Sequence, residues 1–384
     1  MGVYMRAGQG IIVISITLLM LGVVMVNSAS MQISEEPLTL LDMLTSRPTI
    51  LAGLAIVAMF IGSRFPLQLF EKRPFQIPLV YWLLPVSIIL LVLVYIPGIG
   101  REVNYSRRWV DIGGFNFQPS EVVKWIMVVV LAWWSSQNFE SLGRYWKGFI
   151  PPIIGVGTIA AMIAVEDLGT AVLIFATSCF ILFAAGSKFW HFATFVPIAL
   201  SGFYLAVYQV DYRMARLQTY LDPYNAPEKA RYHILQSMST ISEGGLAGLG
   251  LGNGIHKFGY LPEDSTDFIF AVICEELGIF GALAVASLYI GLVILGVYVI
   301  NKAVSSFHQL LVLGIVVTIG LQASMNVLVV TALIPTKGIA LPLLSNGGTG
   351  WLLTAFCLGL IDAIDRRANA SSTVQYAVPT TANA

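Results

Sequence analysis

A carboxylate at the start of a long apolar segment is the first group in this chain that can do chemistry. Asp267 lies in the stretch LPEDSTDFIFAVICEELG, residues 261–278, and Glu275 and Glu276 follow about two helical turns further on. Ionisable side chains at such a depth in an apolar helix are costly and usually functional. Asp267 is therefore either a general base at a membrane surface or an acid that caps the helix. The two glutamates can instead satisfy other buried polar groups.

A second polar group, residues 101–121, has the residue types that bind an anionic headgroup. Arg107, Arg108 and Trp109 precede the QPSE motif that ends at Glu121, and Lys124 follows three residues later. Arginine forms a planar fork that suits phosphate, and Trp109 can stack on a sugar ring or lie in an interfacial belt. Glu121 and Lys124 share one helix face, so they can also form an internal ion pair that holds two helices together.

Two other stretches start predicted helices with polar groups. Asp167, in the motif EDLGT, can line a charged site or cap the helix that follows it. Ser345 opens the motif SNGGT, which can bind an anion through backbone N–H groups or cap its own helix. The glycines of residues 244–254 lack the strand and the Gly-Lys-Ser/Thr of a nucleotide loop, so they favour tight turns and close backbone approach.

The composition places these polar groups in a membrane protein. Of 384 residues, 57% are hydrophobic and only 11% are charged, and the mean hydropathy is +0.80. A soluble domain carries about 25% charged residues. The formal net charge of +0 argues against a nucleic-acid partner. The three cysteines and four histidines have neither disulfide nor metal-ligand spacing.

Apolar runs recur along the whole chain and predict an all-α integral membrane protein with about ten transmembrane helices. One membrane domain covers 1–367, and its long loop 210–266 lies between the seventh and eighth helices. The first span is followed by Asn27-Ser28-Ala29-Ser30, which can imitate a signal-peptidase site, although the many later spans favour an uncleaved helix. Residues 368–384 predict a disordered cytoplasmic tail. The predicted spans are 10–27, 49–64, 77–97, 119–136, 149–165, 168–185, 190–209, 267–300, 307–333 and 347–363.

An even number of spans puts both termini on one side of the membrane. The short loops on that side carry more Lys and Arg than the short loops on the other side, which predicts cytoplasmic termini. The polar stretches 101–121, 210–267 and 334–349 then all fall on the outer face, where they can converge on one site.

Five stretches of this sequence together resemble the SEDS family, the FtsW/RodA/SpoVE group, over about residues 10–365. They are RRWVDIGGFNFQPSEVVKW (107–125), EDLGTAVLI (166–174), YHILQSMSTISEGGLAGLGLG (232–252), YLPEDSTDFIFAVICEELGIFG (260–281) and IPTKGIALPLLSNGGTG (334–350). The segment around Tyr232 and His233 is nearer RodA, whereas the segments 248–263 and 334–345 are nearer FtsW, and we favour the division-type branch that FtsW represents. Departures occur at Ser265, where the family commonly has histidine, and at Asn346 and Gly350 in the last loop.

The resemblance implies a peptidoglycan glycan-strand polymerase of the bacterial inner membrane, with its active site on the outer face. It implies that Asp267 is the aspartate needed for polymerisation of lipid II. We hypothesise that Asp267 removes a proton from the 4-hydroxyl of GlcNAc as that oxygen attacks MurNAc and expels undecaprenyl pyrophosphate. The substrate-binding residues that the resemblance implies are Arg108, Trp109, Glu121, Lys124, Asp167, Lys337 and Ser345.

Positive charge for the departing pyrophosphate would come from these cations or from a divalent cation, Mg or Mn. The resemblance also implies a class B penicillin-binding protein as partner, together with other divisome or elongasome membrane proteins. Two rival functions stay open, and intramembrane charges and ten spans suit the first of them equally well. One is a lipid II flippase or transporter, and the other is a non-catalytic division scaffold.

Overall fold

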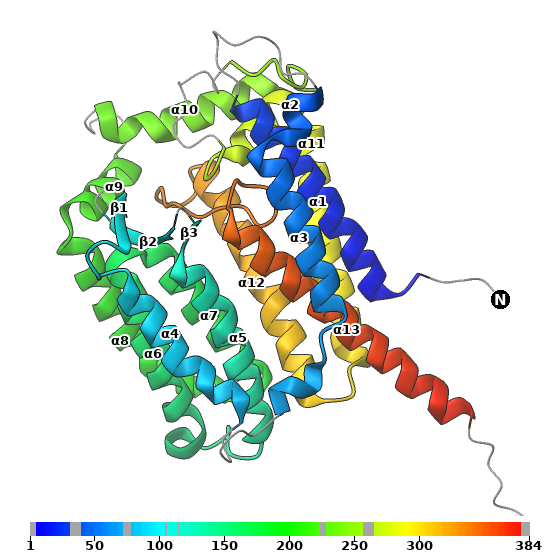
Figure 1. Cartoon of the computed structure of the whole chain (residues 1–384). Helices are drawn as coiled ribbons and strands as arrows, with labels where there is room; N and C mark the ends of the chain where they lie inside the picture. The colour runs from blue at the N-terminus through cyan, green and yellow to red at the C-terminus, as the bar shows by residue number, and fades with distance from the viewer. Residues whose placement is uncertain are drawn as a thin grey trace, which may run out of the picture.

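The computed structural model describes residues 5–30, 40–71, 78–103, 106–113, 115–222, 228–255 and 265–377. The long helices form one bundle, with shorter helices and a small sheet gathered at one end (Figure 1). Its helices are α1 Ala7–Ala29, α2 Leu40–Thr45, α3 Arg47–Ser63, η1 Leu67–Glu71, η3 Leu79–Trp82, α4 Leu83–Leu93, α5 Pro119–Gln137, η4 Tyr145–Phe149, α6 Ile150–Glu166, α7 Leu168–Ala184, α8 Phe189–Tyr208, α9 Asp211–Leu221, α10 Glu228–Gly244, α11 Ile269–Lys302, α12 Ser306–Val330 and α13 Thr349–Ala377.

The helices confirm an all-α membrane protein that crosses the bilayer several times. Five of those described are long and apolar enough to span a membrane: α1, η4 with α6, α8, α11 and α12. Three shorter apolar helices are α3, η3 with α4, and α7. A helix coincides with each of the ten predicted spans. The number of helices that cross the bilayer stays a prediction.

Local sequence explains where several helices begin. Ser46 caps α3 by accepting a hydrogen bond from the Thr49 backbone N–H at 3.4 Å, and Pro48 follows in the first turn. Pro119 occupies the first position of α5, where its missing N–H costs nothing. Within α1, the hydroxyl of Ser15 donates to the Ile11 carbonyl at 2.7 Å, so this polar side chain is satisfied inside its own helix.

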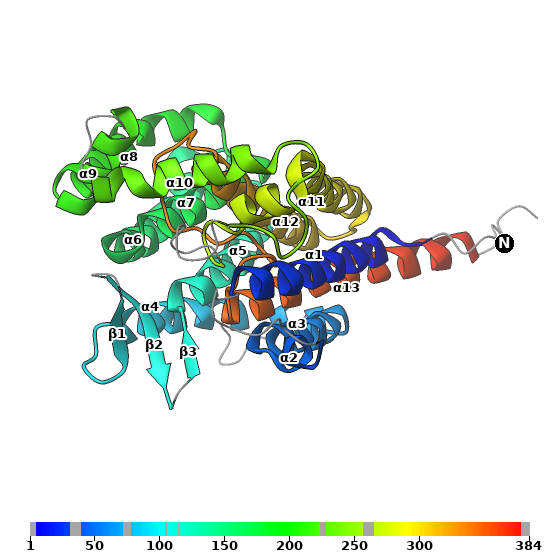
Figure 2. The ribbon, with the colours of Figure 1, turned by 90° about the horizontal axis from the view of Figure 1, so that it is seen from above.

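The predicted polar stretches meet at one end of the bundle. The sheet, α9 and α10 lie at this end in Figure 1, and the orange segment between α12 and α13 lies beneath α10. Seen from above, α10 runs across the bundle while the sheet extends to one side (Figure 2). The described parts of the three polar stretches therefore lie at one end of the bundle, as predicted. That this end faces the outside of the cell stays a prediction.

The first polar stretch contains a small sheet that the helical pattern did not predict. Strands β1 Gly100–Val103, β2 Ser106–Ile112 and β3 Phe115–Phe117 are antiparallel in the order β1-β2-β3. Register pairs Arg101 with Trp109, and Gly113 turns the chain between β2 and β3 with φ 62°. Its strands are short and of mixed polarity. The apolar runs of about 20 residues that predict membrane helices therefore do not reveal it.

The opposite end of the bundle joins α1, α3 and α13 through buried carboxylates. The Ser63 hydroxyl donates to Asp362 at 2.7 Å, Arg366 pairs with the same carboxylate at 2.7 Å, and the Gly8 N–H donates to Asp365 at 3.0 Å. The start of α1 and the later part of α13 therefore lie at the same end. Helix α13 continues to Ala377, so the predicted tail from Ala368 begins inside this helix, and residues 378–384 lie outside the described part of the chain.

Candidate functional site

Asp267 lies one residue before the N-cap of α11, which is Phe268, and it is half-buried. Its backbone carbonyl accepts a hydrogen bond at 2.7 Å from the side-chain amide of Asn326 in α12. The same Asn326 nitrogen donates to the Ile339 carbonyl at 2.8 Å, in the segment between α12 and α13. The Asn346 N–H of that segment also donates to the Ser265 carbonyl at 2.9 Å. Segment 331–348 is thus fastened to the turn that holds Asp267.

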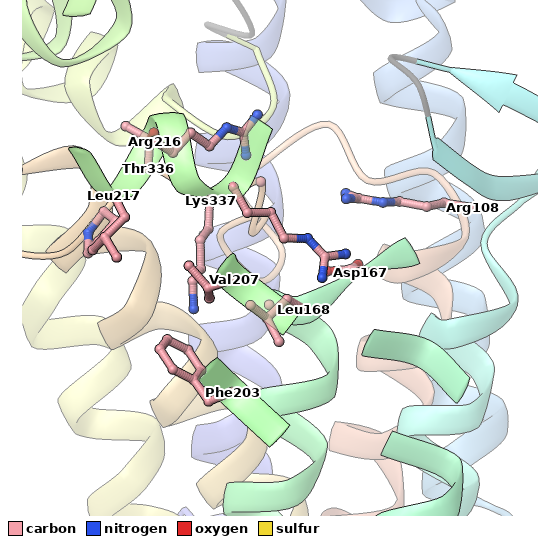
Figure 3. Close-up of a pocket in the computed structure, with 13 residues that line it drawn as sticks. Arg108, Asp167, Leu168, Phe203, Val207, Arg216, Leu217, Thr336 and Lys337 are labelled. Carbon is pink, nitrogen blue, oxygen red and sulfur yellow. The ribbon is translucent and has the colours of Figure 1, made fainter. Parts of the chain in front are cut away.

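A pocket opens beside this turn and holds about 610 Å³ of empty space, part of which is open solvent. Figure 3 shows Arg108 on one side of it, Lys337 on the other and Asp167 between them. Its polar lining is mostly cationic and comes from Arg108, Asp167, Arg213, Arg216, Thr336 and Lys337. Its apolar lining comes from Leu168, Phe203, Val207, Leu217 and Pro335. Such a lining suits a ligand that has both an anionic and an apolar part.

Gly338 connects the pocket to the predicted base. It lines the pocket, and a Cβ built on it would lie 2.8 Å from a carboxylate oxygen of Asp267. The Asp267 carboxylate is therefore next to the pocket wall, and the absence of a side chain at position 338 leaves that approach open.

The amine of Lys337 lines this pocket from the segment between α12 and α13 and is largely buried. Desolvation by burial lowers its pKa from the usual 10.5, the nearby Asp167 carboxylate raises the pKa, and Arg213 lowers it. The net direction is downward, so the charge on Lys337 is easier to lose than that of an exposed lysine.

Asp167 is the N-cap of α7, which is one of the two roles that the sequence predicted for it. It is 5% exposed, and it accepts hydrogen bonds from the Thr170 N–H at 3.0 Å and the Thr170 hydroxyl at 2.8 Å. The Gln118 amide donates to it at 3.3 Å. Asp167 also lines the pocket, so the capping and the pocket-lining interpretations both hold.

Two arginines of α9 line the pocket although the sequence analysis did not single them out. The Arg213 guanidinium donates to the carbonyls of Ala164, Val165 and Ala206 at 2.7–3.0 Å, which attaches α9 to the carboxyl end of α6 and to α8. Arg216 lies one turn further along α9 and faces the same pocket. Their i, i+3 spacing in the loop 210–266 was the available signal.

Arg108 reaches the pocket from β2, where its Nε donates to the Glu166 carbonyl at 2.8 Å. Alternation along the strand puts the neighbouring Trp109 on the opposite face of the sheet. Trp109 is half-buried and is not among the residues that line this pocket. The predicted sugar contact of Trp109 stays a prediction that the pocket geometry does not support.

Glu121 and Lys124 form a buried network away from the pocket lining. Lys124 Nζ lies 2.8 Å from Glu121 Oε2 and donates to Gln322 Oε1 at 2.9 Å, and the Lys124 side chain is 1% exposed. The Gln322 amide in turn donates to the Ala340 carbonyl at 2.8 Å. The predicted ion pair forms, but it lies within α5, and the hydrogen bonds of Gln322 are what join α5, α12 and segment 331–348.

Ser345 is also used inside segment 331–348. Its hydroxyl accepts a hydrogen bond from the Leu341 N–H at 2.7 Å, and the residue is 1% exposed. It therefore folds the segment and does not line the pocket. Of the predicted site residues, the fold brings together Arg108, Asp167 and Lys337 in the pocket and Asp267 beside it, while the other four support or flank them.

The donor set does not fit a divalent cation held by the protein alone. Among the described residues no group of three or more His, Cys, Asp or Glu side chains could hold a metal ion. The pocket offers Asp167 and four cations, and Asp167 already accepts three hydrogen bonds.

The chain is similar to known proteins over most of its length. The profile of the FtsW/RodA/SpoVE family, described as cell cycle proteins, matches residues 9–370. The chain is 34% identical to the probable peptidoglycan glycosyltransferase FtsW of Geobacter sp. (strain M18), covering 93% of this chain and 96% of that protein. It is likewise 34% identical to stage V sporulation protein E of Bacillus subtilis (strain 168), covering 93% and 96%.

Two solved structures share the fold. RodA, the rod shape determining protein of Thermus thermophilus, aligns with a TM-score of 0.65 at 24% identity over 94% of this chain and 96% of its own. A chain from a peptidoglycan synthase complex that coordinates polymerization and crosslinking aligns with a TM-score of 0.73 at 24% identity over 94% and 97%. With a family match over almost its whole length, this chain belongs to the FtsW/RodA/SpoVE family of cell cycle proteins.

Proposed function

We propose that this protein is a peptidoglycan glycosyltransferase that polymerises lipid II into glycan strands. The observation that carries the proposal is the position of the Asp267 carboxylate beside Gly338, at the wall of a pocket whose charged lining is mostly arginine and lysine. The names of relatives that are 34% identical over most of the chain support the same activity. The branch, division or elongation, is proposed to be the FtsW-like one because most of the similar relatives carry that name.

The proposed reaction is a single displacement with one base. Asp267 removes the proton of the acceptor 4-hydroxyl on GlcNAc, and the oxygen attacks the anomeric carbon of MurNAc on the donor. The bond from that carbon to the pyrophosphate breaks, and undecaprenyl pyrophosphate leaves with the electron pair. The α-linked donor is thereby inverted to a β-1,4 linkage. A general base increases the rate roughly 10²–10⁴-fold. The rest of the rate enhancement must come from positioning of the substrates and from charge stabilisation.

The cationic and the apolar side chains of the pocket are proposed to bind different parts of the substrate. Arg108, Arg216 and Lys337 are proposed to contact the pyrophosphate, because each reaches the pocket with a cationic group. The apolar side, with Phe203 and Val207 of α8, is proposed to receive the start of the prenyl chain. Exposed apolar side chains on α8, among them Ile198, Leu200 and Phe203, mark this helix as one that faces lipid.

Membrane orientation and partners follow as proposals from the same activity. The end of the bundle with the pocket faces outward and both termini face the cytoplasm of the bacterial inner membrane, consistent with the Lys and Arg distribution of the short loops. A class B penicillin-binding protein and other divisome membrane proteins are the proposed partners. The shared fold with a chain of a peptidoglycan synthase complex supports this expectation.

The test is purified full-length protein incubated with lipid II in detergent, where no membrane sides exist. Glycan polymer that a muramidase digests to disaccharide units supports a polymerase. Unchanged lipid II, both alone and with the cognate class B transpeptidase, would contradict the proposal, and transport of lipid II across vesicles by the same preparation would favour a flippase instead.

A further inference from the structure

Helix α11 is broken at Gly278, nine residues after it begins. Gly278 has φ 64° and ψ −163°, outside the helical region, and it separates a short arm, Ile269–Leu277, from the long remainder of α11. The arm directly follows Asp267, and all of its residues from Ile269 to Glu276 are buried. A break of this kind removes the helical partners of backbone carbonyls before it and of N–H groups after it. In an apolar interior those groups must be bonded to other parts of the protein.

Residues 244–255, which we call the glycine clamp, supply these partners. They connect α10 to the break on both of its sides, so that two carbonyls of the arm and two N–H groups of the remainder are satisfied. The bonds are Leu249 N–H to Glu275 carbonyl at 2.9 Å, Gly250 N–H to Glu276 carbonyl at 3.0 Å, Ile279 N–H to Gly245 carbonyl at 3.1 Å and Phe280 N–H to Leu246 carbonyl at 3.5 Å.

The glycines of the clamp are required by its closeness to the arm. A Cβ on Gly244 would lie 1.8 Å from the Cys274 carbonyl oxygen, and one on Gly248 would lie 2.2 Å from the Glu276 carbonyl oxygen. A Cβ on Gly278 would lie 2.4 Å from the Gly248 nitrogen. Larger residues cannot occupy these positions without moving the backbone. This contact is the close approach that the glycine pattern predicted without a location.

Two buried carboxylates complete the attachment. Glu275 and Glu276 are both fully buried. The Ile255 N–H donates to Glu275 at 2.8 Å, and the Gly252 N–H donates to Glu276 at 3.1 Å. Glu276 also accepts the Ser28 hydroxyl of α1 at 2.7 Å. Glu276 therefore joins the arm, the clamp and α1 through its carboxyl oxygens.

The other end of the arm holds the proposed base. Asn326 fixes the backbone of Asp267, and the clamp fixes the arm at Gly278, about 13 Å away along nine helical residues. A short, rigid helix with both ends attached transmits a shift at one end to the other. Loosening the clamp should thus displace the carboxylate from the pocket wall.

We infer that Glu276 is a positioning residue for the reaction. Through the glycine clamp and Ser28 it holds the arm that presents Asp267 to the pocket, without contacting the substrate itself. This inference rests on the proposed function, because it takes Asp267 as the base. The two glutamates of the apolar segment then hold the arm in place. The sequence alone allowed either a functional role or hydrogen bonding to other buried polar groups.

The experiment compares full-length wild type with Glu276→Ala, Glu276→Gln and Ser28→Ala. Steady-state polymerisation of lipid II gives kcat and KM, and hydrogen exchange by mass spectrometry reports the backbone bonds of residues 249–252 and 279–280. Glu276→Ala should lower kcat about 10–100-fold with KM changed less than about twofold, because a misplaced base affects chemistry more than binding. It should also speed exchange at both segments. Glu276→Gln, which retains one acceptor oxygen, should recover much of the rate.

The control is Glu243→Gln, which alters an exposed glutamate of α10 and should change neither readout. Ser28→Ala removes one donor and keeps the glutamate, so it gives a milder shift in the same direction if Glu276→Ala does not fold. A wild-type kcat for Glu276→Ala, or unchanged exchange at both segments, would overturn the inference. If wild type makes no polymer, the proposed function fails by itself, and the exchange comparison still decides whether Glu276 holds the clamp to the arm.

Discussion

The carboxylate of Asp267 lies so close to Gly338 that a methyl group at position 338 would come within 2.8 Å of an oxygen of that carboxylate. These two residues belong to different parts of the chain, the turn before α11 and the segment between α12 and α13. Asn326 holds both segments through one amide nitrogen, at 2.7 Å from the Asp267 carbonyl and 2.8 Å from the Ile339 carbonyl. Helix α12 therefore positions the proposed base and the pocket wall relative to each other.

Gly338→Ala should impair catalysis without unfolding the protein. The added methyl must displace the Asp267 side chain, and a misplacement of about 1 Å can cost on the order of 10² in rate. We expect kcat to fall about 10–100-fold while the thermal unfolding midpoint stays close to that of wild type. Gly347→Ala in the same segment is the control, because its Cβ would make ordinary contacts at 3.5 Å or more. Equal rates for the two variants would contradict the placement of Asp267.

Binding of lipid II should weaken at alkaline pH, and it should do so below the pH at which an exposed lysine loses its proton. Burial lowers the pKa of Lys337 from 10.5, so the ammonium loses its proton at a lower pH than an exposed lysine and with it the ability to attract pyrophosphate. KM for lipid II should therefore rise as the pH increases toward 10.5. Lys337→Arg keeps its charge throughout this window and should remove the rise.

A second variant checks the cause of this shift. The Asp167 carboxylate raises the pKa of Lys337, so Asp167→Asn should move the increase in KM to still lower pH. A KM profile that is the same for wild type, Lys337→Arg and Asp167→Asn would show that the Lys337 charge does not act on the substrate.

Lys124 should matter for stability more than for substrate binding. Its ammonium is paired with Glu121 and Gln322 in a buried network, and removing one partner of such a pair typically costs about 3–5 kcal/mol. Lys124→Met should thus lower the unfolding midpoint in detergent. In the double variant Glu121→Gln with Lys124→Met, the loss should be smaller than the sum of the two single losses. A stable Lys124→Met protein with a raised KM would instead place Lys124 in contact with lipid II.

Much of the fold was predictable because apolar length is a direct signal of membrane helices. All ten predicted spans coincide with helices, and the polar stretches do gather at one end. The sheet around Trp109 and the helices α9 and α10 were not predicted, since segments of mixed polarity lack the long apolar runs that mark membrane helices.

The sequence predicted several residues that lie at or beside the pocket. It could not predict which polar side chains are turned into the protein by the packing of one helix against another. Asp267, Arg108 and Lys337 are at or beside the pocket. Spacing could not tell whether Lys124 faces a ligand or Gln322, because only the packing of α5 against α12 decides this. Arg216 belongs to α9, whose place over the pocket depends on contacts between distant parts of the chain.

The most direct measurement is the polymerisation rate of Asp267→Asn against that of Asp222→Asn, which alters an exposed aspartate after α9. Purified proteins of equal unfolding midpoint are given lipid II, and glycan product is counted over time. The account predicts that Asp267→Asn loses at least about 10²-fold in rate, as expected when a general base is removed, while Asp222→Asn polymerises like wild type. Normal glycan synthesis by Asp267→Asn would contradict the account.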